Sequence, residues 1–252
     1  MKLRNRVWRV AQPLLESRGF ELRRTQMNRD DWDLYPLLIR LMREHQATVV
    51  LDVGANRGGF VDRLRGSGYT GRVISFEPLP EPFGMLARRV AGDPRWEAAE
   101  IALSDTPGHA PMRRSGSGDV TSSLLPTAAA MVHALPAAAP GECVEVTVST
   151  VDAEANGRLS ESERLFLKID TQGNELAVLE GAQDALARTV GVLAELSLIE
   201  LYDGQALFAE VIDWLAERGF LLLAMAPAFH DPRTGQLLQV DALFGQLSPA
   251  AA

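Results

Sequence analysis

From Thr48 onward, short apolar runs alternate with segments of helical periodicity, and this alternation restricts the fold more than any other feature of the sequence. Strands separated by amphipathic helices are typical of βαβ units, in which the strands lie parallel in one sheet. Because such crossovers are right-handed, the chain is expected to form an α/β fold with a doubly wound, seven-stranded sheet. The predicted strands cover residues 48–53, 72–77, 97–103, 165–170, 190–196, 220–226 and 240–245. The predicted helices begin near Gly58, Glu81, Asn174 and Gln205.

Both ends of the chain are expected to lie outside this domain. A length of 252 residues suits one complete core. We therefore assign residues 47–247 to the domain, residues 1–46 to an N-terminal helical extension and residues 248–252 to a disordered tail. The extension is basic at its start, and two helices are predicted in it, the second over residues 34–45. The basic helix could bind a membrane surface or a partner, or pack on the domain with its arginines in solvent.

Residues 106–148 interrupt the alternation of strands and helices. A Gly/Ser-rich piece (113–124) and an Ala/Pro-rich piece (126–141) precede an alternating strand at 144–150. Insertions beside the carboxyl edge of a sheet are often lids or substrate loops, so a lid-like insertion is expected here. A plain flexible linker is the alternative.

Charge and composition exclude several classes of protein. The net charge of −8 argues against nucleic-acid binding by the surface as a whole, because phosphate contacts need clustered cations. The single cysteine, Cys143, forms no intrachain disulfide, and no Cys/His pattern has zinc spacing. No apolar stretch has the length of a membrane span or a secretory signal, so the protein is interpreted as cytoplasmic. A homodimer is compatible with the sequence.

A glycine turn follows the first predicted strand. The letters VVLDVG lead into ANRGG, where Gly54, Gly58 and Gly59 allow the backbone to approach a ligand closely. The next helix then offers free N–H groups at its N-terminus. Glu77 ends the second strand 23 residues after Gly54, where a carboxylate can accept both hydroxyls of a ribose. Turn and carboxylate together predict an adenosyl cofactor or a dinucleotide.

Five segments give a more specific resemblance. LDVGANRGGF, ISFEP, IALSD, TSSL and LKIDTQGNELAVLEGA, in this order and spacing, resemble the FkbM family of methyltransferases. The resemblance extends from about Val49 to Gly245. It implies a Rossmann-like fold of the class I methyltransferase type, with S-adenosylmethionine as cofactor.

The resemblance also implies a set of cofactor-binding residues. The methionine part would be held by Asp52, Gly54, Ala55, Asn56 and Gly58, the ribose by Glu77 with Pro78 beside it, and the adenine amine by Ser104 and Asp105. The chemistry agrees, because a carboxylate suits an ammonium group and an adenine amine needs an acceptor. By themselves, Ser104 and Asp105 could equally be a helix cap or a turn pair.

Acidic residues gather at two later strand ends. Lys168 and Asp170 share one face of their strand, either as a structural ion pair or with Lys168 tuned as a general base, and Asp170 is the candidate catalytic residue. Glu195 closes the next strand, so Asp170 and Glu195 could hold Mg²⁺, cap helices or bind the substrate. Where the family usually has Glu, this chain has Gln172, which puts a metal site in doubt.

The acceptor side is less defined. His133 is a further candidate base, since it flanks the irregular insertion, and a surface loop is the alternative reading of its position. Ser122 and Ser123, together with Glu195, are expected to bind the acceptor. The resemblance favours O-methylation of a hydroxyl on a sugar, a glycolipid or a specialised metabolite.

Two other function classes remain open at this point. A Rossmann-type NAD(P)-binding oxidoreductase would also use Glu77, although the turn reads G-A-N-R-G-G instead of G-x-G-x-x-G. A noncatalytic module could retain the fold and bind a partner through the basic helix. The intact glycine turn with Glu77 argues against loss of cofactor binding.

Overall fold

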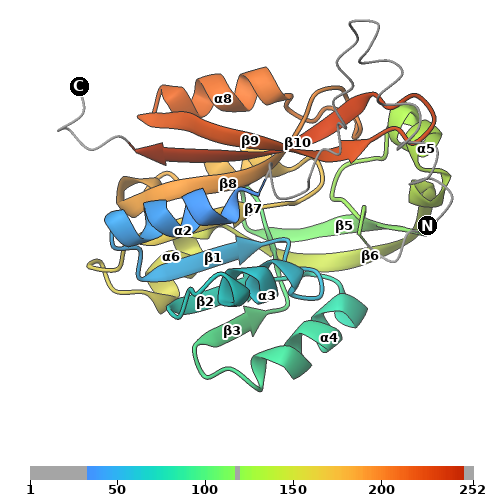
Figure 1. The fold of residues 1–252 in the computed structure, drawn as a ribbon. Helices are drawn as coiled ribbons and strands as arrows, with labels where there is room; N and C mark the ends of the chain where they lie inside the picture. The colour runs from blue at the N-terminus through green and yellow to red at the C-terminus, as the bar shows by residue number, and fades with distance from the viewer. Residues whose placement is uncertain (1–32, 117–119, 247–252) are drawn as a thin grey trace, which may run out of the picture. The chain divides into compact units, whose positions relative to one another are not determined.

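The computed structural model describes residues 33–116 and 120–246. Its centre is a seven-stranded sheet in the order β3-β2-β1-β7-β8-β10-β9 (Figure 1). β10 is antiparallel to both of its neighbours, and all other neighbouring strands in this sheet are parallel. The predicted α/β fold with a seven-stranded sheet is confirmed. The strands are β1 (Val49–Val53), β2 (Arg72–Phe76), β3 (Trp96–Ala99), β7 (Leu165–Ile169), β8 (Thr189–Ser197), β9 (Phe220–His230) and β10 (Leu237–Gln246).

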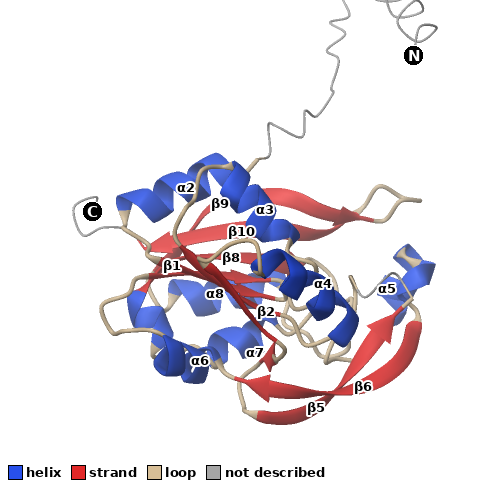
Figure 2. Ribbon diagram, turned by 90° about the horizontal axis from the view of Figure 1, so that it is seen from below, coloured by secondary structure: helices blue, strands red, loops and turns tan. Residues whose placement is uncertain are grey.

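Helices cover both faces of this sheet (Figure 2). One core contains side chains from α6 (Val151–Arg158), α7 (Glu175–Glu180) and α8 (Phe208–Ala216). The other contains side chains from α2 (Tyr35–Glu44), α3 (Gly59–Gly66) and α4 (Pro80–Val90). The central strands are mostly apolar because both of their faces are buried. In the described part of the chain, no helix has both the length and the apolar character needed to cross a membrane.

Alternation along β1 decides which side chain enters which core. Val49, Leu51 and Val53 pack with α6, α7 and α8, whereas Val50 packs with α2 and α3. A strand places successive side chains on opposite faces, so Asp52 lies on the same face as Val50. This position removes the Asp52 carboxylate from solvent and requires a partner for it within the protein.

Helix α2 belongs to the sheet domain. The sequence placed it in an extension of residues 1–46, but its buried Leu38 and Met42 share one core with Val50 and Phe166. The compact unit that contains the sheet accordingly begins at Asp33. The predicted basic helix and the predicted tail, residues 248–252, lie outside the described residues.

The prediction of one strand over residues 97–103 is wrong. β3 ends at Ala99 in the main sheet, and β4 (Ala102–Leu103) begins a second sheet with the order β4-β6-β5. Ile101 continues the apolar run across the bend, so the pattern of apolar residues contains no sign of the change of sheet.

Regular structure forms most of the insertion at 106–148. β5 (Gly108–Ser115) and β6 (Pro140–Ser149) form an antiparallel pair, and α5 (Ala129–Ala134) with the short helix η2 (Pro136–Ala138) lies between them in the chain. Met131, Ala134 and Ala138 pack against Leu201 and Tyr202. The Ala/Pro-rich piece therefore has its own small core, which a plain linker would lack.

The position of α2 gives the first testable prediction. Leu38→Ala removes a fully buried side chain and leaves a cavity, so we expect the free energy of unfolding to fall by about 2–5 kcal/mol in urea denaturation. Arg40→Ala, at an exposed position of the same helix, is the matched control and should change it by less than about 0.5 kcal/mol. Equal stability of the two variants would show that α2 is no part of the core.

Candidate active site

An open cavity lies at the carboxyl ends of β1, β2, β7 and β8, with about 750 Å³ of empty space that includes its mouth. Ligands of doubly wound sheets bind at this edge. One wall contains the glycine turn and Glu77, the second is apolar, and the third carries two carboxylates. The residues that form the walls are Gly54, Asn56, Glu77 and Pro78; Leu79, Ile101, Leu103, Met112 and Leu124; and Asp170, Gln172 and Glu195.

The glycine turn is held in place by close packing of backbone on backbone. Gly54 has φ +74°, and a Cβ there would collide with the carbonyl oxygen of Asp170 at the end of the neighbouring strand. Gly58 has φ +82°, and a Cβ there would press on the ring of Trp96. Both positions thus need glycine for the fold itself, while Gly54 also lines the cavity.

Glu77 holds two loops together at the cavity wall. Its Oε2 accepts a hydrogen bond from the backbone N–H of Asn56 at 2.8 Å, and its Oε1 accepts one from the N–H of Leu79 at 2.9 Å. Burial raises the pKa of Glu77 to about 7, although both N–H groups favour the charged form. Each carboxylate oxygen retains further acceptor capacity, so Glu77 can still bind ligand hydroxyls.

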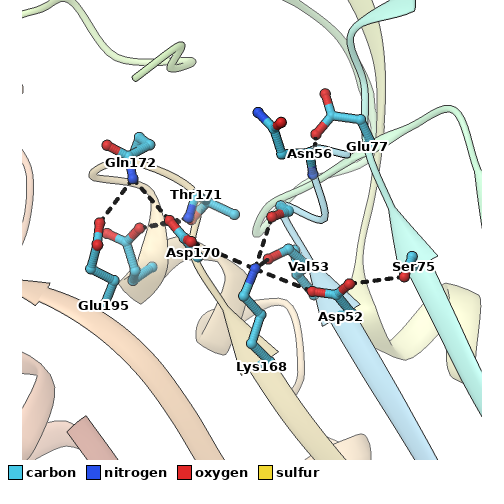
Figure 3. A network of polar contacts seen from close by, with 12 residues as sticks. Asp52, Val53, Asn56, Ser75, Glu77, Lys168, Asp170, Thr171, Gln172 and Glu195 are labelled. Atoms are coloured by element: carbon cyan, nitrogen blue, oxygen red, sulfur yellow. Dashed lines mark hydrogen bonds and ion pairs between the residues drawn. The ribbon is translucent and has the colours of Figure 1, made fainter. Parts of the chain in front are cut away.

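Lys168 lies at the centre of a polar row beneath the glycine turn (Figure 3). In register across β2, β1 and β7, Ser75 donates to Asp52 Oδ2 at 2.8 Å, and Lys168 Nζ lies 3.1 Å from Asp52 Oδ1. The ammonium group also donates to the carbonyl oxygen of Gly54 at 2.8 Å. Burial acts to lower the pKa of Lys168, but Asp52 and Asp170 outweigh it and the net shift is upward.

This geometry favours the structural ion pair over a general base. An ammonium group with a raised pKa keeps its proton near neutral pH. Asp52 is fully buried and does not line the cavity. It balances the charge of Lys168, and direct contact of Asp52 with a cofactor stays a prediction without support from this geometry.

Three side chains form the acidic end of the cavity (Figure 3). Gln172 Nε2 donates to Asp170 Oδ1 and to Glu195 Oε2, each at 2.8 Å. Gln239 Nε2 donates to the same oxygen of Glu195 at 2.9 Å. Asp170 Oδ2 lies 3.6 Å from Lys168 Nζ, so this end of the cavity is connected to the row beneath the turn.

Burial raises the pKa of three acidic side chains around this end of the cavity. It raises the pKa of Glu195 well above its ordinary range, and Asp170 raises that pKa further. Burial is also the main reason why the pKa of Glu175 is raised to about 7 and that of Asp241, opposite Glu195 on β10, to about 6. A carboxylate that costs free energy to ionise is a stronger proton acceptor once it is ionised.

The remaining predicted cofactor residues lie at different depths. Ala55 and Gly58 are buried behind the cavity wall, and Pro78 is part of that wall. Ser104 and Asp105 follow the wall residue Leu103, and the hydroxyl of Ser104 donates to Asp105 Oδ1 at 3.1 Å. Their role toward an adenine stays a prediction.

The insertion contributes to the cavity through Val120, Ser122 and Leu124. Ser123 is buried instead and donates to the backbone oxygen of Gln172 at 2.6 Å. It thus fixes the acidic end and does not line the cavity.

His133 is not brought to the cavity. It is exposed on α5, with Nδ1 3.3 Å from Arg233 Nη1, and does not line the cavity wall. The prediction that it acts as a base has no support from this arrangement and is not taken further.

Several wall residues were not identified from the sequence. Met112 lies on β5, a strand that was not predicted, and neither Leu79 nor Ile101 was named as a site residue. Gln239, which donates to Glu195 from behind the wall, comes from β10, far along the chain from the acidic end. The only available signal was the position of Leu79 two residues after Glu77, close to the end of β2.

Comparison with known families identifies the chain. The family described as "Methyltransferase FkbM domain" matches residues 52–222, which contain the glycine turn, Glu77 and the acidic end. The chain belongs to the FkbM methyltransferase family. Together with the seven-stranded sheet, this assigns it to the methyltransferases with a Rossmann-like α/β fold and supports S-adenosylmethionine as methyl donor.

Solved structures with a similar fold are distant in sequence. An FkbM methyltransferase from Methylobacillus flagellatus KT shares 14% identity with a TM-score of 0.49, over 78% of this chain and 43% of that one. An rRNA methylase from Streptococcus thermophilus shares 11% (TM-score 0.44), over 84% of this chain and 95% of that one. A putative tRNA (m1A22) methyltransferase from Streptococcus pneumoniae, in complex with S-adenosyl-L-methionine, shares 13% (TM-score 0.45; 84% and 75%). The present chain thus spans less than half the length of its Methylobacillus relative. No curated protein sequence matches.

The raised pKa of Glu77 predicts a pH dependence of stability. A carboxyl group whose folded-state pKa is about 7 stabilises the fold fully below its unfolded value near 4.5, and this contribution is lost as the pH rises through 7. From pH 5 to pH 8, the free energy of unfolding of the ligand-free parent should therefore fall by about 2 kcal/mol more than that of Glu77→Gln.

Urea denaturation at the two pH values measures this difference. Glu100→Gln, at an exposed position, is the control and should follow the parent. Parallel curves for the parent and Glu77→Gln would show that Glu77 ionises normally in the folded protein.

Proposed function

We propose that this FkbM protein is an S-adenosylmethionine-dependent O-methyltransferase that acts on a hydroxyl of a sugar, a glycolipid or a specialised metabolite. The observation that carries the proposal is one cavity lined at one side by the glycine turn and Glu77 and at the other by Asp170 and Glu195. The first side suits the cofactor, and the second side suits removal of a hydroxyl proton.

The first side fits an adenosyl group by its donor and acceptor set. Glu77 would bind the ribose hydroxyls, because it lines the cavity and each of its oxygens keeps acceptor capacity beside one backbone N–H. Leu79, Ile101 and Leu103 offer an apolar surface for a flat base. Gly54 and Asn56 place backbone groups next to the polar remainder of the cofactor.

The second side would accept the proton of the substrate. S-adenosylmethionine supplies a methyl group on a positively charged sulfur, which keeps the electron pair of the broken S–C bond. The hydroxyl oxygen forms the new C–O bond and loses its proton to a carboxylate of the acidic end. Asp170 and Glu195 provide that carboxylate and orient the hydroxyl, and the surrounding walls exclude water.

The charge of the cavity selects the class of acceptor. Among the described residues that line it, three are acidic and none is Lys or Arg. A phosphate backbone needs cationic contacts, so a neutral or cationic acceptor fits better than a nucleic acid. Ser122 would add a hydroxyl for a polar acceptor.

The cofactor assignment predicts the effect of Glu77→Ala. Loss of charge-assisted hydrogen bonds to the ribose should weaken S-adenosylmethionine and S-adenosylhomocysteine binding by about 1.5–3 kcal/mol in calorimetry, with no measurable NAD binding by the parent. The control Glu100→Ala should bind as the parent does. Parent-like affinity of a folded Glu77→Ala would place the ribose elsewhere.

The acceptor assignment predicts the effect of Asp170→Asn. A radiolabelled methyl-transfer screen against pooled sugars, glycolipids and metabolites identifies the acceptor first. Asp170→Asn should then lower kcat about 10²–10⁴-fold, because the asparagine amide cannot take up a proton, while the affinity for the cofactor changes little. Asp203→Asn, at an exposed position, is the matched control. Unchanged kcat in Asp170→Asn would remove it from the reaction.

A further inference from the structure

Two carboxylates at the acidic end are held together by one uncharged group. Gln172 Nε2 lies 2.8 Å from Asp170 Oδ1 and 2.8 Å from Glu195 Oε2, so each of its two hydrogens has its own carboxylate acceptor. Carboxylates this close repel one another unless a donor or a cation lies between them. Here an amide nitrogen takes that position (Figure 3).

The orientation of the amide is fixed by its other contacts. Tyr202, which is fully buried, has its hydroxyl 2.8 Å from Gln172 Oε1 and acts as donor there. With both carboxylates ionised, the opposite orientation of the amide would point Oε1 at two acceptor oxygens, so the orientation with Nε2 toward them is favoured. The backbone of Gln172, at φ +58°, is anchored by the hydroxyl of Ser123, which donates to its carbonyl oxygen.

The same contacts do not fit a divalent cation. An amide nitrogen has no lone pair to offer a metal, and its N–H groups point to the space between the two carboxylates where a shared ion would have to bind. In the described parts of the chain, no group of three or more His, Cys, Asp or Glu side chains could hold a metal ion. The donor set thus disagrees with the Mg²⁺ site considered from the sequence.

We propose that Gln172 is a positioning residue that replaces a divalent cation: its amide bridges Asp170 and Glu195 into a metal-free pair that receives the acceptor proton. This inference rests on the proposed methyl transfer. It adds which group positions the two carboxylates that accept the proton. The bridge takes one oxygen of each carboxylate. Among the described residues, none donates a hydrogen bond to Glu195 Oε1, which leaves this oxygen for the hydroxyl of the acceptor.

Gln172→Glu tests the replacement directly. This variant places a third carboxylate between Asp170 and Glu195 and creates the oxygen ligand set of a Mg²⁺ or Mn²⁺ site. In calorimetry with MgCl₂ and MnCl₂ alone, we expect one binding site in Gln172→Glu and none in the parent at the same millimolar concentrations. Gln183→Glu, the same change in an exposed turn after α7, is the matched control and should bind neither ion.

Activity provides a second readout. Methyl transfer by the parent should be unchanged by a chelator, whereas Gln172→Glu should lose activity in chelator and regain it with Mn²⁺ or Mg²⁺. Gln172→Met, which has similar length and no donor, should lower kcat about 10–100-fold and leave the KM for S-adenosylmethionine within about threefold. A purely structural role would give neither cation rescue nor this separation of kcat from KM.

Three results would overturn the proposal: cation binding by the parent at the acidic end, no cation binding by a Gln172→Glu variant that still binds S-adenosylhomocysteine, or parent-like kcat in Gln172→Met. The calorimetry needs no acceptor. If no hydroxyl compound is methylated, the proposed function fails, and cation binding by Gln172→Glu still decides whether the amide occupies a cation position.

Discussion

The buried ammonium group of Lys168 is the contact on which the active-site edge of the sheet depends. It neutralises Asp52 in the centre of the sheet and donates to the backbone oxygens of Val53 and Gly54, where β1 turns into the loop. Removal of one partner from a buried ion pair leaves an unpaired charge and costs several kcal/mol. The shape of the glycine turn is therefore coupled to a charge pair that lies beneath it and outside the cavity.

The same cation favours negative charge on the carboxylates of the cavity, which burial opposes. Burial already raises the pKa of Glu77, Glu195 and Asp241, so each of these groups ionises at a cost. Lys168 is near enough to favour the ionised form of Glu77 and Asp241, while hydrogen bonds from Gln172 and Gln239 do so for Glu195. Uncharged amides thus complement the lysine in favouring the ionised form of these carboxylates, against the effect of burial.

The sequence predicted the half of the site that depends on local signals. The glycine turn, Glu77 and the Lys168–Asp170 face all follow from strand periodicity and from residues that adjoin a strand end. The other half depends on tertiary contacts. β5 has Gly108, Pro111 and two arginines, and it becomes a strand only through pairing with β6. Gln172 was identified as a departure from the family pattern, but its contact with Tyr202 joins distant segments and has no signal in the spacing of residues.

This division would allow the proposed cofactor and acceptor sides of the cavity to change separately. The cofactor side is built from β1 and β2 and the turns that follow them, where collisions with Asp170 and Trp96 leave Gly54 and Gly58 without alternatives. Val120, Ser122 and Leu124 reach the cavity from the insertion. Its small core with Tyr202 and the cluster in which its strands pack with Leu79 are both separate from the two cores of the sheet. A substitution there can reshape the acceptor wall without disturbing the row at Lys168. Tyr202 and Ser123 are exceptions. Tyr202 packs in the core of the insertion and also orients Gln172, and Ser123 of the insertion donates to the backbone oxygen of Gln172. The packing of the insertion and the geometry of the carboxylate pair are therefore physically linked.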